Sequence, residues 1–354
     1  MNRKMKTIIA LLGLFALFSG ISCDTSSITL TTNKPGDSGV YKSEDKGNHW
    51  AQKIFVERVK KKDTTIGGVN VKRFVVDPDD SRILYILTNE SGVWKTVDGA
   101  EQWRQIYPGG GVGDLSIDGK NHNNLFIASG NTIARSDDAG STWIKAYLES
   151  RPGLSVNSVV IDRSDARRVY AGTSAGDVLV TKDTGASWQV LYRFDGVPLI
   201  RMLQIPSRLL FAATPNQGLW RSSDEGATWT NTSESLKDKP GANDIRDIVS
   251  DPGVPNGLFL ITNYGIFRTR DGGETWNEVT LIARPGGADI KSMAVSPVNS
   301  QELYYAVPGG LYRSSDGGRR WATLALPVGN VPSAMVIDWY NPDIIYSGFT
   351  KVKK

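Results

Sequence analysis

Positively charged side chains recur at one position of a repeated pattern in this sequence. Short runs rich in valine and isoleucine end in a turn, as in the run from Phe74 to Asp77. Five residues before the turn position of each run stand Lys72, Gly113, Asn157, Arg201, Arg246, Lys291 and Ser333. Four of these seven residues are basic, and Arg73 adjoins the first. If the runs surround one axis, their cations form a partial ring that focuses positive potential on an anionic group.

The basic residues at this repeated position, together with Arg73 and Asn157, define a candidate binding site. Its members are Lys72, Arg73, Asn157, Arg201, Arg246 and Lys291. The alternative is that they are solvated rim charges paired with neighbouring acids, because Asp114 and Asp247 stand nearby. The run behind Arg201 ends in Ile205-Pro206 rather than in an acid, so its alignment has the least support.

Acidic side chains offer a competing chemistry, glycoside hydrolysis. That reaction uses two carboxyl groups roughly 5–10 Å apart. The acids expected near the same opening are Glu90, Asp114, Asp195, Asp244 and Asp289. Sequence spacing does not fix the separation of any two of them, so no catalytic residue is assigned. The chain has two histidines, which argues against a histidine-based metal cluster or nucleophile triad, and we expect no metal and no cofactor.

The elements that would position these residues are marked by a motif repeated seven times. Each copy begins with serine or threonine, has aspartate two positions later and ends in tryptophan. The copies span residues 43–50, 96–103, 136–143, 181–188, 222–229, 269–276 and 314–321. Their starts lie 53, 40, 45, 41, 47 and 45 residues apart, which predicts one supersecondary unit per copy. The second copy has Ala100 where the others have glycine, so its turn is expected to differ.

The residue types of the motif indicate a structural role. Its aspartate and hydroxyl accept hydrogen bonds from backbone N–H groups of the turn, and its glycine permits a positive φ. Its tryptophan starts the next strand and buries a large ring. We therefore assign seven aspartates to structure and not to binding: Asp45, Asp98, Asp138, Asp183, Asp224, Asp271 and Asp316.

The flanking sequence completes a four-stranded unit. A short strand such as 219–222 precedes the motif, and the strand before it carries one aromatic residue per repeat. These aromatic residues, expected in the core, are Tyr85, Phe126, Tyr170, Phe211, Phe259, Tyr304 and Tyr346. The chain opens with the third and fourth strands of a unit at 39–55 and ends with the first and second at 334–337 and 344–348. Pairing these ends would close a ring and remove exposed sheet edges.

The repeated S-x-D-x-G-x-T-W pattern resembles the Asp-box, or BNR repeat, and the mature chain resembles seven-bladed Asp-box β-propellers. The resemblance implies an all-β fold of four-stranded antiparallel blades. In such blades the motif turns share a face with the first-to-second strand turns, so we expect a site on the opposite face or in the central channel.

Relatives with this repeat differ in function. Sialidases have six blades, an arginine triad and a Phe/Tyr-Arg-Ile-Pro segment, and the nearest string here is Leu191-Tyr-Arg-Phe-Asp195. Xyloglucanase-type hydrolases pair two propellers with catalytic acids facing across the cleft, and sortilin-type propellers have ten blades. By size the chain is most similar to the photosystem II assembly-factor family, which implies an exported scaffold or chaperone with an arginine patch.

The beginning of the sequence predicts export. Three basic residues precede an apolar stretch at 8–21, and Cys23 follows as the first residue after a possible cleavage site. This arrangement resembles the lipobox of bacterial lipoproteins, although Gly20 stands where leucine is usual. We expect a signal peptide at 1–22, a polar tether at 23–38 with a lipid on Cys23, and a propeller at 39–354. The alternatives are ordinary cleavage, which leaves a free thiol, or an uncleaved anchor.

Charge balance limits the choice of partner. Without the leader, 38 basic residues face 37 acidic ones, which argues against nucleic acid. A local basic cluster at 58–63 is expected to be an exposed loop that meets anionic lipid or wall polymer. The sequence therefore favours a monomeric, membrane-tethered, extracytoplasmic and non-catalytic propeller. Its expected ligand is a protein, peptide or glycan, and the basic positions suit one with an acidic group. The alternative is a glycoside hydrolase that uses carboxylates on the open face.

Overall fold

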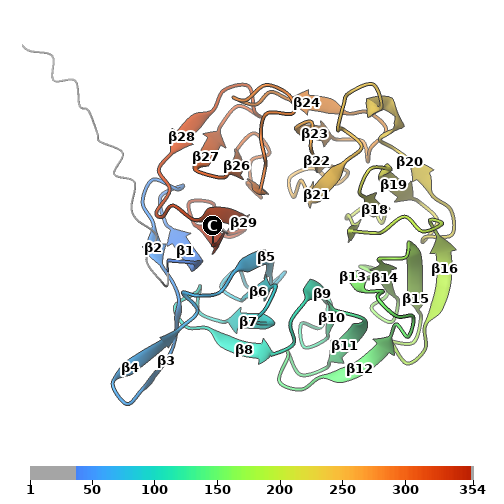
Figure 1. The fold of residues 1–354 in the computed structure, drawn as a ribbon, viewed down its shortest axis with the longest axis horizontal. Helices are drawn as coiled ribbons and strands as arrows, with labels where there is room; N and C mark the ends of the chain where they lie inside the picture. The colour runs from blue at the N-terminus through green and yellow to red at the C-terminus, as the bar shows by residue number, and fades with distance from the viewer. Residues whose placement is uncertain (1–36, 352–354) are drawn as a thin grey trace, which may run out of the picture. The chain divides into compact units, whose positions relative to one another are not determined.

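The computed structural model describes residues 37–351, which form seven four-stranded antiparallel sheets around a central channel (Figure 1). Short strands rich in β-branched and aromatic residues, each bounded by turn residues, produce this arrangement. The structure confirms the predicted all-β, seven-bladed propeller. Residues 1–36, which include Cys23 and the expected leader and tether, lie outside the described part of the chain.

Each blade runs outward from the channel in the order of the chain. We number the blades from the one that begins at Val71, and the last blade combines both ends of the chain. The innermost strands are β5 (Val71–Val76), β9 (Val112–Ile117), β13 (Val156–Ile161), β17 (Arg201–Gln204), β21 (Ile245–Ser250), β25 (Ser292–Val295) and β29 (Val331–Ile337). The second strands are β6 (Leu84–Thr88), β10 (Leu125–Ser129), β14 (Val169–Thr173), β18 (Leu210–Thr214), β22 (Leu258–Thr262), β26 (Leu303–Val307) and β30 (Ile345–Thr350).

The outer half of each blade contains the shorter strands. The third strands are β7 (Val93–Thr96), β11 (Thr132–Ser136), β15 (Asp177–Thr181), β19 (Gly218–Ser222), β23 (Ile266–Thr269), β27 (Gly310–Ser314) and β1 (Gly39–Ser43). The outermost strands are β8 (Arg104–Tyr107), β12 (Ile144–Leu148), β16 (Gln189–Arg193), β20 (Thr230–Asn231), β24 (Asn277–Val279), β28 (Ala322–Leu324) and β2 (Ala51–Gln52). A single 3-10 turn, η1 (Glu234–Leu236), follows β20.

The ends of the described chain close the ring, as predicted. The seventh blade has the strand order β2-β1-β30-β29, and β1 pairs with β30 from Gly39↔Phe349 to Ser43↔Ile345. This pairing satisfies backbone groups that would otherwise form an exposed sheet edge. It also brings the start and the finish of the described chain to one face of the ring.

The motif turns, which we call Asp-box turns, lie on the same face as the first-to-second strand turns. Six blades show this directly, because the backbone N–H of the motif bonds to a carbonyl of that turn, as in Gly99 N to Arg82 O at 2.9 Å. We call this the Asp-box face. The other face contains the loops that enter the innermost strands and both ends of the described chain, and we call it the loop face.

Each motif aspartate organises its own turn. In the fourth copy, Asp183 accepts hydrogen bonds from the Thr181 hydroxyl at 2.6 Å and from the Ser187 backbone N–H at 2.9 Å. These bonds stabilise the carboxylate and lower the pKa of Asp183 to about 2. The second copy keeps the same pattern, because Ala100 adopts φ +76° and donates its N–H to Thr96 Oγ1 at 3.1 Å. The expectation that this turn differs is therefore wrong.

Four motif tryptophans join neighbouring blades, namely Trp103, Trp143, Trp276 and Trp321, whereas Trp50 and Trp229 donate to a carbonyl of their own turn. Trp103 Nε1 donates to Lys53 O at 3.0 Å, and Trp143 Nε1 donates to Ile106 O at 2.7 Å. Each acceptor belongs to the segment before the tryptophan's own blade. All seven aromatic residues of the second strands are at most 1% exposed, which confirms them as core.

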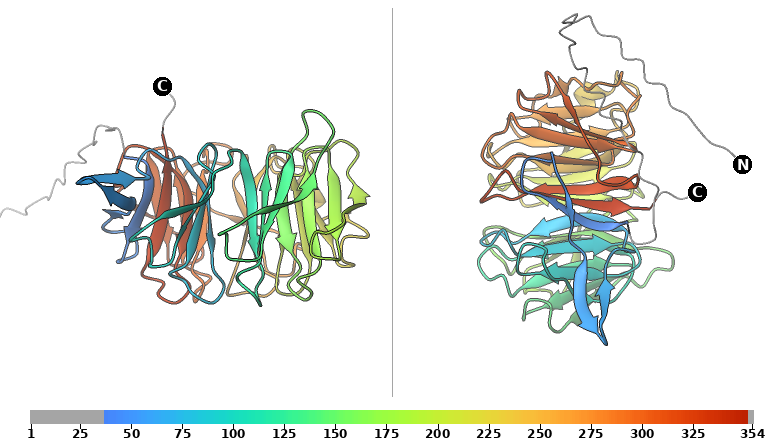
Figure 2. Two further views of the ribbon diagram at one scale, coloured as in Figure 1. Left: turned by 90° about the horizontal axis from the view of Figure 1, so that it is seen from below. Right: turned by 90° about the vertical axis from the view of Figure 1, so that its left-hand side faces the viewer.

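The predicted basic loop at 58–63 is instead a β-hairpin. Strands β3 (Phe55–Val59) and β4 (Lys62–Thr65) pair and project outward beyond the ring (Figure 2). Phe55 begins this hairpin and does not end the fourth strand of the closing blade. Within it, Arg58 and Asp63 form an ion pair at 2.6 Å. Among residues 37–351, no helix is long and apolar enough to cross a membrane.

Candidate functional site

The innermost strands contain a bulge near their loop-face ends. The pairing register shifts between Val71 and Arg73, so Lys72 stands outside the ladder. Equivalent shifts bypass Gly113, Asn157, Arg246 and Ser333. A bulge places an extra residue in the strand and leaves it unpaired. Five of the seven predicted positions are therefore bulge residues at the loop-face mouth of the channel.

Arg201 does not belong to this bulge register. It pairs with Ala213 directly, as Arg73 pairs with Leu87. The Ile205 N–H bonds to Leu209 O four residues later, whereas the Asp77 N–H bonds to Ile83 O six residues later. The turn of the fourth blade is thus shorter, so the sequence alignment of Arg201 was wrong by one position. Arg201 lies one residue deeper in the channel, level with Arg73.

At this deeper level an ion-pair layer crosses the channel. Arg73 Nη1 lies 3.0 Å from Asp114 Oδ1, and Arg73 Nη2 lies 3.6 Å from Asp247 Oδ1. Arg201 Nε lies 3.5 Å from the same oxygen of Asp247. Strands β5 and β21, which hold Arg73 and Asp247, lie on opposite sides of the channel (Figure 1). Two arginines and two aspartates therefore form a layer with no net charge.

Burial controls the electrostatics of the layer. Loss of hydration raises the pKa of Asp114, and this effect is opposed by Arg73 and by hydrogen bonds from Ser158 and two backbone N–H groups. Asp247 keeps 37% of its side-chain surface, yet protein encloses it within the channel and raises its pKa in the same way. Lys72 has its pKa lowered by loss of hydration and by Arg73, and it donates to Val112 O at 3.0 Å.

The remaining cations lie on the loop face with partners of their own. Arg246 Nε donates to Asn263 Oδ1 at 2.6 Å, and its Nη2 lies 3.5 Å from Asp244. Lys291 Nζ lies 2.7 Å from Asp289 Oδ2. These contacts agree with the alternative that Arg246 and Lys291 are rim charges paired with neighbouring acids. Asn157 donates instead to a backbone carbonyl, Leu199 O, at 2.9 Å.

Two of the candidate residues share a depression on the loop face. It lies between the fifth and sixth blades, has a volume of about 780 Å³ and opens to solvent. Its lining consists of Arg246, Asn263, Gly286, Gly287, Ala288, Asp289, Ile290 and Lys291. The structure thus separates the predicted site into three parts: this depression, the bulge residues Lys72 and Asn157, and the deeper ion-pair layer.

Four of the five acids considered for hydrolysis, all except Asp195, are engaged with other groups. Glu90 accepts a bond from Asn70 Nδ2 at 3.2 Å, and Asp244 accepts one from Asn263. Asp195 occupies a tight turn with φ +41°. Among the described residues, no group of three or more histidine, cysteine, aspartate or glutamate side chains is placed to hold a metal ion.

Sequence reasoning missed a second acidic pair on the loop face. Glu149 and Asp177 are each 3% exposed as side chains, and Arg151 bridges them. Arg193 also contacts Asp177 at 3.1 Å. Hydrogen bonding to Arg151 lowers the pKa of Glu149 to about 2, so this carboxylate is unsuited to act as a general acid. The pairing Glu149-Ser-Arg151 is visible in the sequence, but its partner Asp177 comes from another blade.

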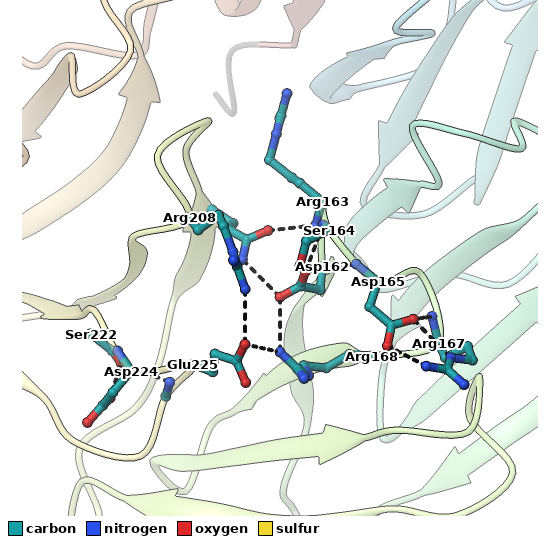
Figure 3. A network of polar contacts seen from close by, with 12 residues as sticks. Asp162, Arg163, Ser164, Asp165, Arg167, Arg168, Arg208, Ser222, Asp224 and Glu225 are labelled. Atoms are coloured by element: carbon teal, nitrogen blue, oxygen red, sulfur yellow. Dashed lines mark hydrogen bonds and ion pairs between the residues drawn. The ribbon is translucent and has the colours of Figure 1, made fainter.

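Sequence reasoning also missed an arginine-rich network on the Asp-box face. Arg168 Nη1 lies 2.6 Å from Glu225 and 3.7 Å from the buried Asp162, and Arg208 contacts the same Glu225 at 3.1 Å (Figure 3). The Arg163 side chain extends away from this network, as Figure 3 shows, and lines a cavity at this end of the channel. That cavity has a volume of about 540 Å³.

Comparison with protein families and curated proteins supports the repeat class. The model for sortilin (neurotensin receptor 3) and Vps10 matches residues 217–346. A xyloglucanase, Xgh74A of Acetivibrio thermocellus, is 24% identical over 258 residues, which covers 60% of this chain and 26% of the relative. A probable oligoxyloglucan-reducing end-specific xyloglucanase of Neosartorya fischeri is 30% identical over 201 residues, covering 43% and 25%. The chain spans about a quarter of the length of these relatives.

Solved structures share the fold at low sequence identity. A Niastella koreensis GH74 enzyme superposes with a TM-score of 0.65 at 15% identity, covering 84% of this chain and 53% of that one. The structure of YCF48 bound to D1 peptide superposes with a TM-score of 0.62 at 16% identity, covering 93% and 99%. These likenesses and the structure confirm an Asp-box-type seven-bladed propeller and establish no activity.

Proposed function

We propose that this chain is a non-catalytic binding propeller that holds an acidic peptide segment on its loop face. The observation that carries the proposal is the open depression that contains Arg246 and Lys291 at the mouth of a channel crossed by the ion-pair layer. Such a surface suits an extended ligand that lies across the mouth. It suits less well a substrate that must enter a deep cleft between two free carboxylates.

Fold likeness adds modest support for a peptide ligand. One structural neighbour, YCF48 bound to D1 peptide, covers 93% of this chain and was solved with that peptide. The local charges set a condition on binding, because Asp244 and Asp289 already contact the two cations. An acidic ligand must compete with these carboxylates, so its binding should be weak at high salt.

The test uses charge reversal and fluorescence anisotropy. A panel of labelled peptides with and without acidic side chains is titrated with the parent protein and with the Arg246→Glu, Lys291→Glu double variant. The matched control reverses two exposed cations of the Asp-box face, Lys182→Glu and Arg319→Glu. We expect the first double variant to lose affinity for acidic peptides by at least tenfold and the control to keep it. Equal losses in both, or no acidic preference in the parent, would reject the proposal.

Hydrolysis of xyloglucan is the second candidate, and the named xyloglucanases among the curated relatives favour it. The chain matches about a quarter of each relative, so their activity cannot be transferred directly. Incubation with xyloglucan followed by a reducing-end assay tests this function. Product formation that Asp244→Asn or Asp289→Asn abolishes would favour the hydrolase. Binding of xyloglucan oligosaccharides without cleavage would favour a glycan-binding propeller.

We also propose that the propeller is exported and held at a membrane by a lipid on Cys23. Asp37, the first residue that the structure describes, lies fourteen residues after Cys23. A fully extended chain of that length spans at most about 50 Å. The closing strands place this end on the loop face, so a lipid anchor would keep the proposed binding face near the membrane. Labelling with radioactive palmitate tests the idea: the parent should incorporate label and Cys23→Ser should not.

A further inference from the structure

The end of the channel that opens on the Asp-box face contains a cavity with an unsatisfied arginine at its inner end. Arg201 lines this cavity, and its guanidinium atoms Nε and Nη1 are enclosed without a hydrogen-bond partner among residues 37–351. The 3.5 Å approach of Nε to Asp247 gives electrostatic attraction but no hydrogen bond. Buried donors are normally satisfied, so the Arg201 guanidinium keeps unused hydrogen-bonding capacity beside this cavity.

The walls of the cavity are apolar over one full level of the channel. Two positions beyond the ion-pair layer, the innermost strands contribute Val75, Ser116, Val160, Leu203, Val249, Ala294 and Val336. Every one of these residues lines either this cavity or an adjoining one of about 430 Å³. Six of the seven side chains are apolar, so they form a collar between the layer and the mouth. A slim apolar group inserted here would be removed from water on several sides.

The mouth and the remaining polar groups favour an anion. Proline or tryptophan from four blades lines the opening, as do Arg163 and Lys120. Two acids line the cavity, and both are engaged: Asp114 by Arg73, and Asp162 by Ser164 and Gln204. The Arg163 guanidinium has no hydrogen-bond or ion-pair partner among residues 37–351 and extends away from the neighbouring network (Figure 3). The cavity thus offers cationic donors but no free carboxylate.

We propose that this cavity binds an amphiphile with a slim aliphatic chain and one anionic end group, a carboxylate or a phosphate. The anionic group would accept hydrogen bonds from Arg201 at the inner end, and the chain would lie in the apolar collar. Guanidinium groups bind both kinds of oxyanion through paired hydrogen bonds. The site lies on the opposite face from the depression at Arg246 and Lys291, so it is independent of the proposed peptide function.

The first experiment varies the ligand and needs no variant. Isothermal titration calorimetry compares hexanoate, hexyl phosphate, hexanol and hexylamine, and then the carboxylates from butanoate to octanoate. We expect the two anions to bind at least tenfold more tightly than hexanol or hexylamine, and affinity to rise about fourfold per added methylene. The tighter of hexanoate and hexyl phosphate identifies the preferred end group. Equal binding of hexanol and hexanoate, or no dependence on chain length, would overturn the proposal.

The second experiment locates the site. Arg201→Met should abolish the preference for hexanoate over hexanol. Because this variant also loses the Asp247 contact and could unfold, Val160→Phe provides an independent test: it narrows the collar and leaves the ion-pair layer intact, and it should weaken hexanoate by at least tenfold. Arg208→Met, on the same face but outside the cavity, is the matched control and should bind as the parent does. Parent-like affinity in a folded Val160→Phe protein would contradict this placement.

Discussion

Removal of the arginine that crosses the channel should destabilise the propeller strongly. Arg73→Met leaves the Asp114 carboxylate, which is 8% exposed, without its cation, and removes one of the two arginines that contact Asp247. Breaking a buried ion pair by removal of one partner costs about 3–5 kcal/mol, because the remaining charge stays buried and unpaired. Unfolding entropy is roughly 2.1 cal/mol/K per residue, which gives about 0.66 kcal/mol/K for the 315 described residues. The expected fall in Tm is therefore roughly 5–8 °C.

Differential scanning calorimetry with a matched variant checks this value. Arg246→Met removes a cation that is 56% exposed and 3.5 Å from its acid, so its cost should stay below about 1 kcal/mol. The pH dependence gives a second signature. Without Arg73, the pKa of Asp114, already raised by burial, rises further, and a carboxyl group with a raised pKa loses folded-state stability as pH increases. The penalty of Arg73→Met should therefore shrink from pH 7 to pH 4. If the Tm of Arg73→Met lies within 2 °C of the parent value, the ion-pair layer does not stabilise the propeller as expected.

Three further predictions concern the scaffold. Deletion of 332–354 removes the two inner strands of the closing blade, so it should open the ring and lower the Tm by more than 10 °C in calorimetry; an unchanged Tm would contradict closure by paired ends. Asp138 and Asp183 have pKa values lowered to about 2, so their contribution to stability is present above about pH 4 and is lost as pH falls towards 2; thermal melts across this range should show a shallower decline for Asp183→Asn than for the parent. Lys61 has φ +68° at the hairpin tip, and Lys61→Gly should stabilise the hairpin by about 1 kcal/mol, measured as slower amide exchange of β3 and β4 with no change in overall Tm.

Local repetition explains why the scaffold could be predicted from the sequence. Each blade has its own turn motif, core aromatic residue and innermost strand. The seven repeats can therefore be aligned with one another, and a weak signal in one repeat is supported by the other six. The ends could be joined because they contribute complementary halves of a blade. The hairpin β3–β4 was missed because its tip has two lysines with positive φ instead of the usual asparagine and glycine.

The candidate site was harder to predict because it depends on register and on distance across the ring. The short turn after Gln204 shifts Arg201 by one residue, and no acid marks that turn. The contact of Arg73 with Asp247 joins residues 174 positions apart on opposite walls, which no local pattern encodes. Alignment of the repeats in the sequence places four cations at equivalent positions: Lys72, Arg201, Arg246 and Lys291. The structure instead places Lys72 and Arg246 in bulges at the mouth, Lys291 just before β25, and Arg201 in the neutral layer below.

The neutral layer gives the two ends of the channel different chemistry. Above it, Arg246 and Lys291 each contact a carboxylate of their own, so an acidic ligand must displace Asp244 or Asp289 before it gains a full ion pair. Below it, the enclosed donors of Arg201 have one carboxylate nearby, Asp247 at 3.5 Å from Nε, but no hydrogen bond to it, and the surrounding wall is apolar. Electrostatic attraction should therefore be weak and salt-sensitive at the loop face, where water screens it, and stronger per contact beside Arg201, where protein encloses the guanidinium. The face that the turn motifs had marked as structural thus offers the more selective environment for a small anionic ligand.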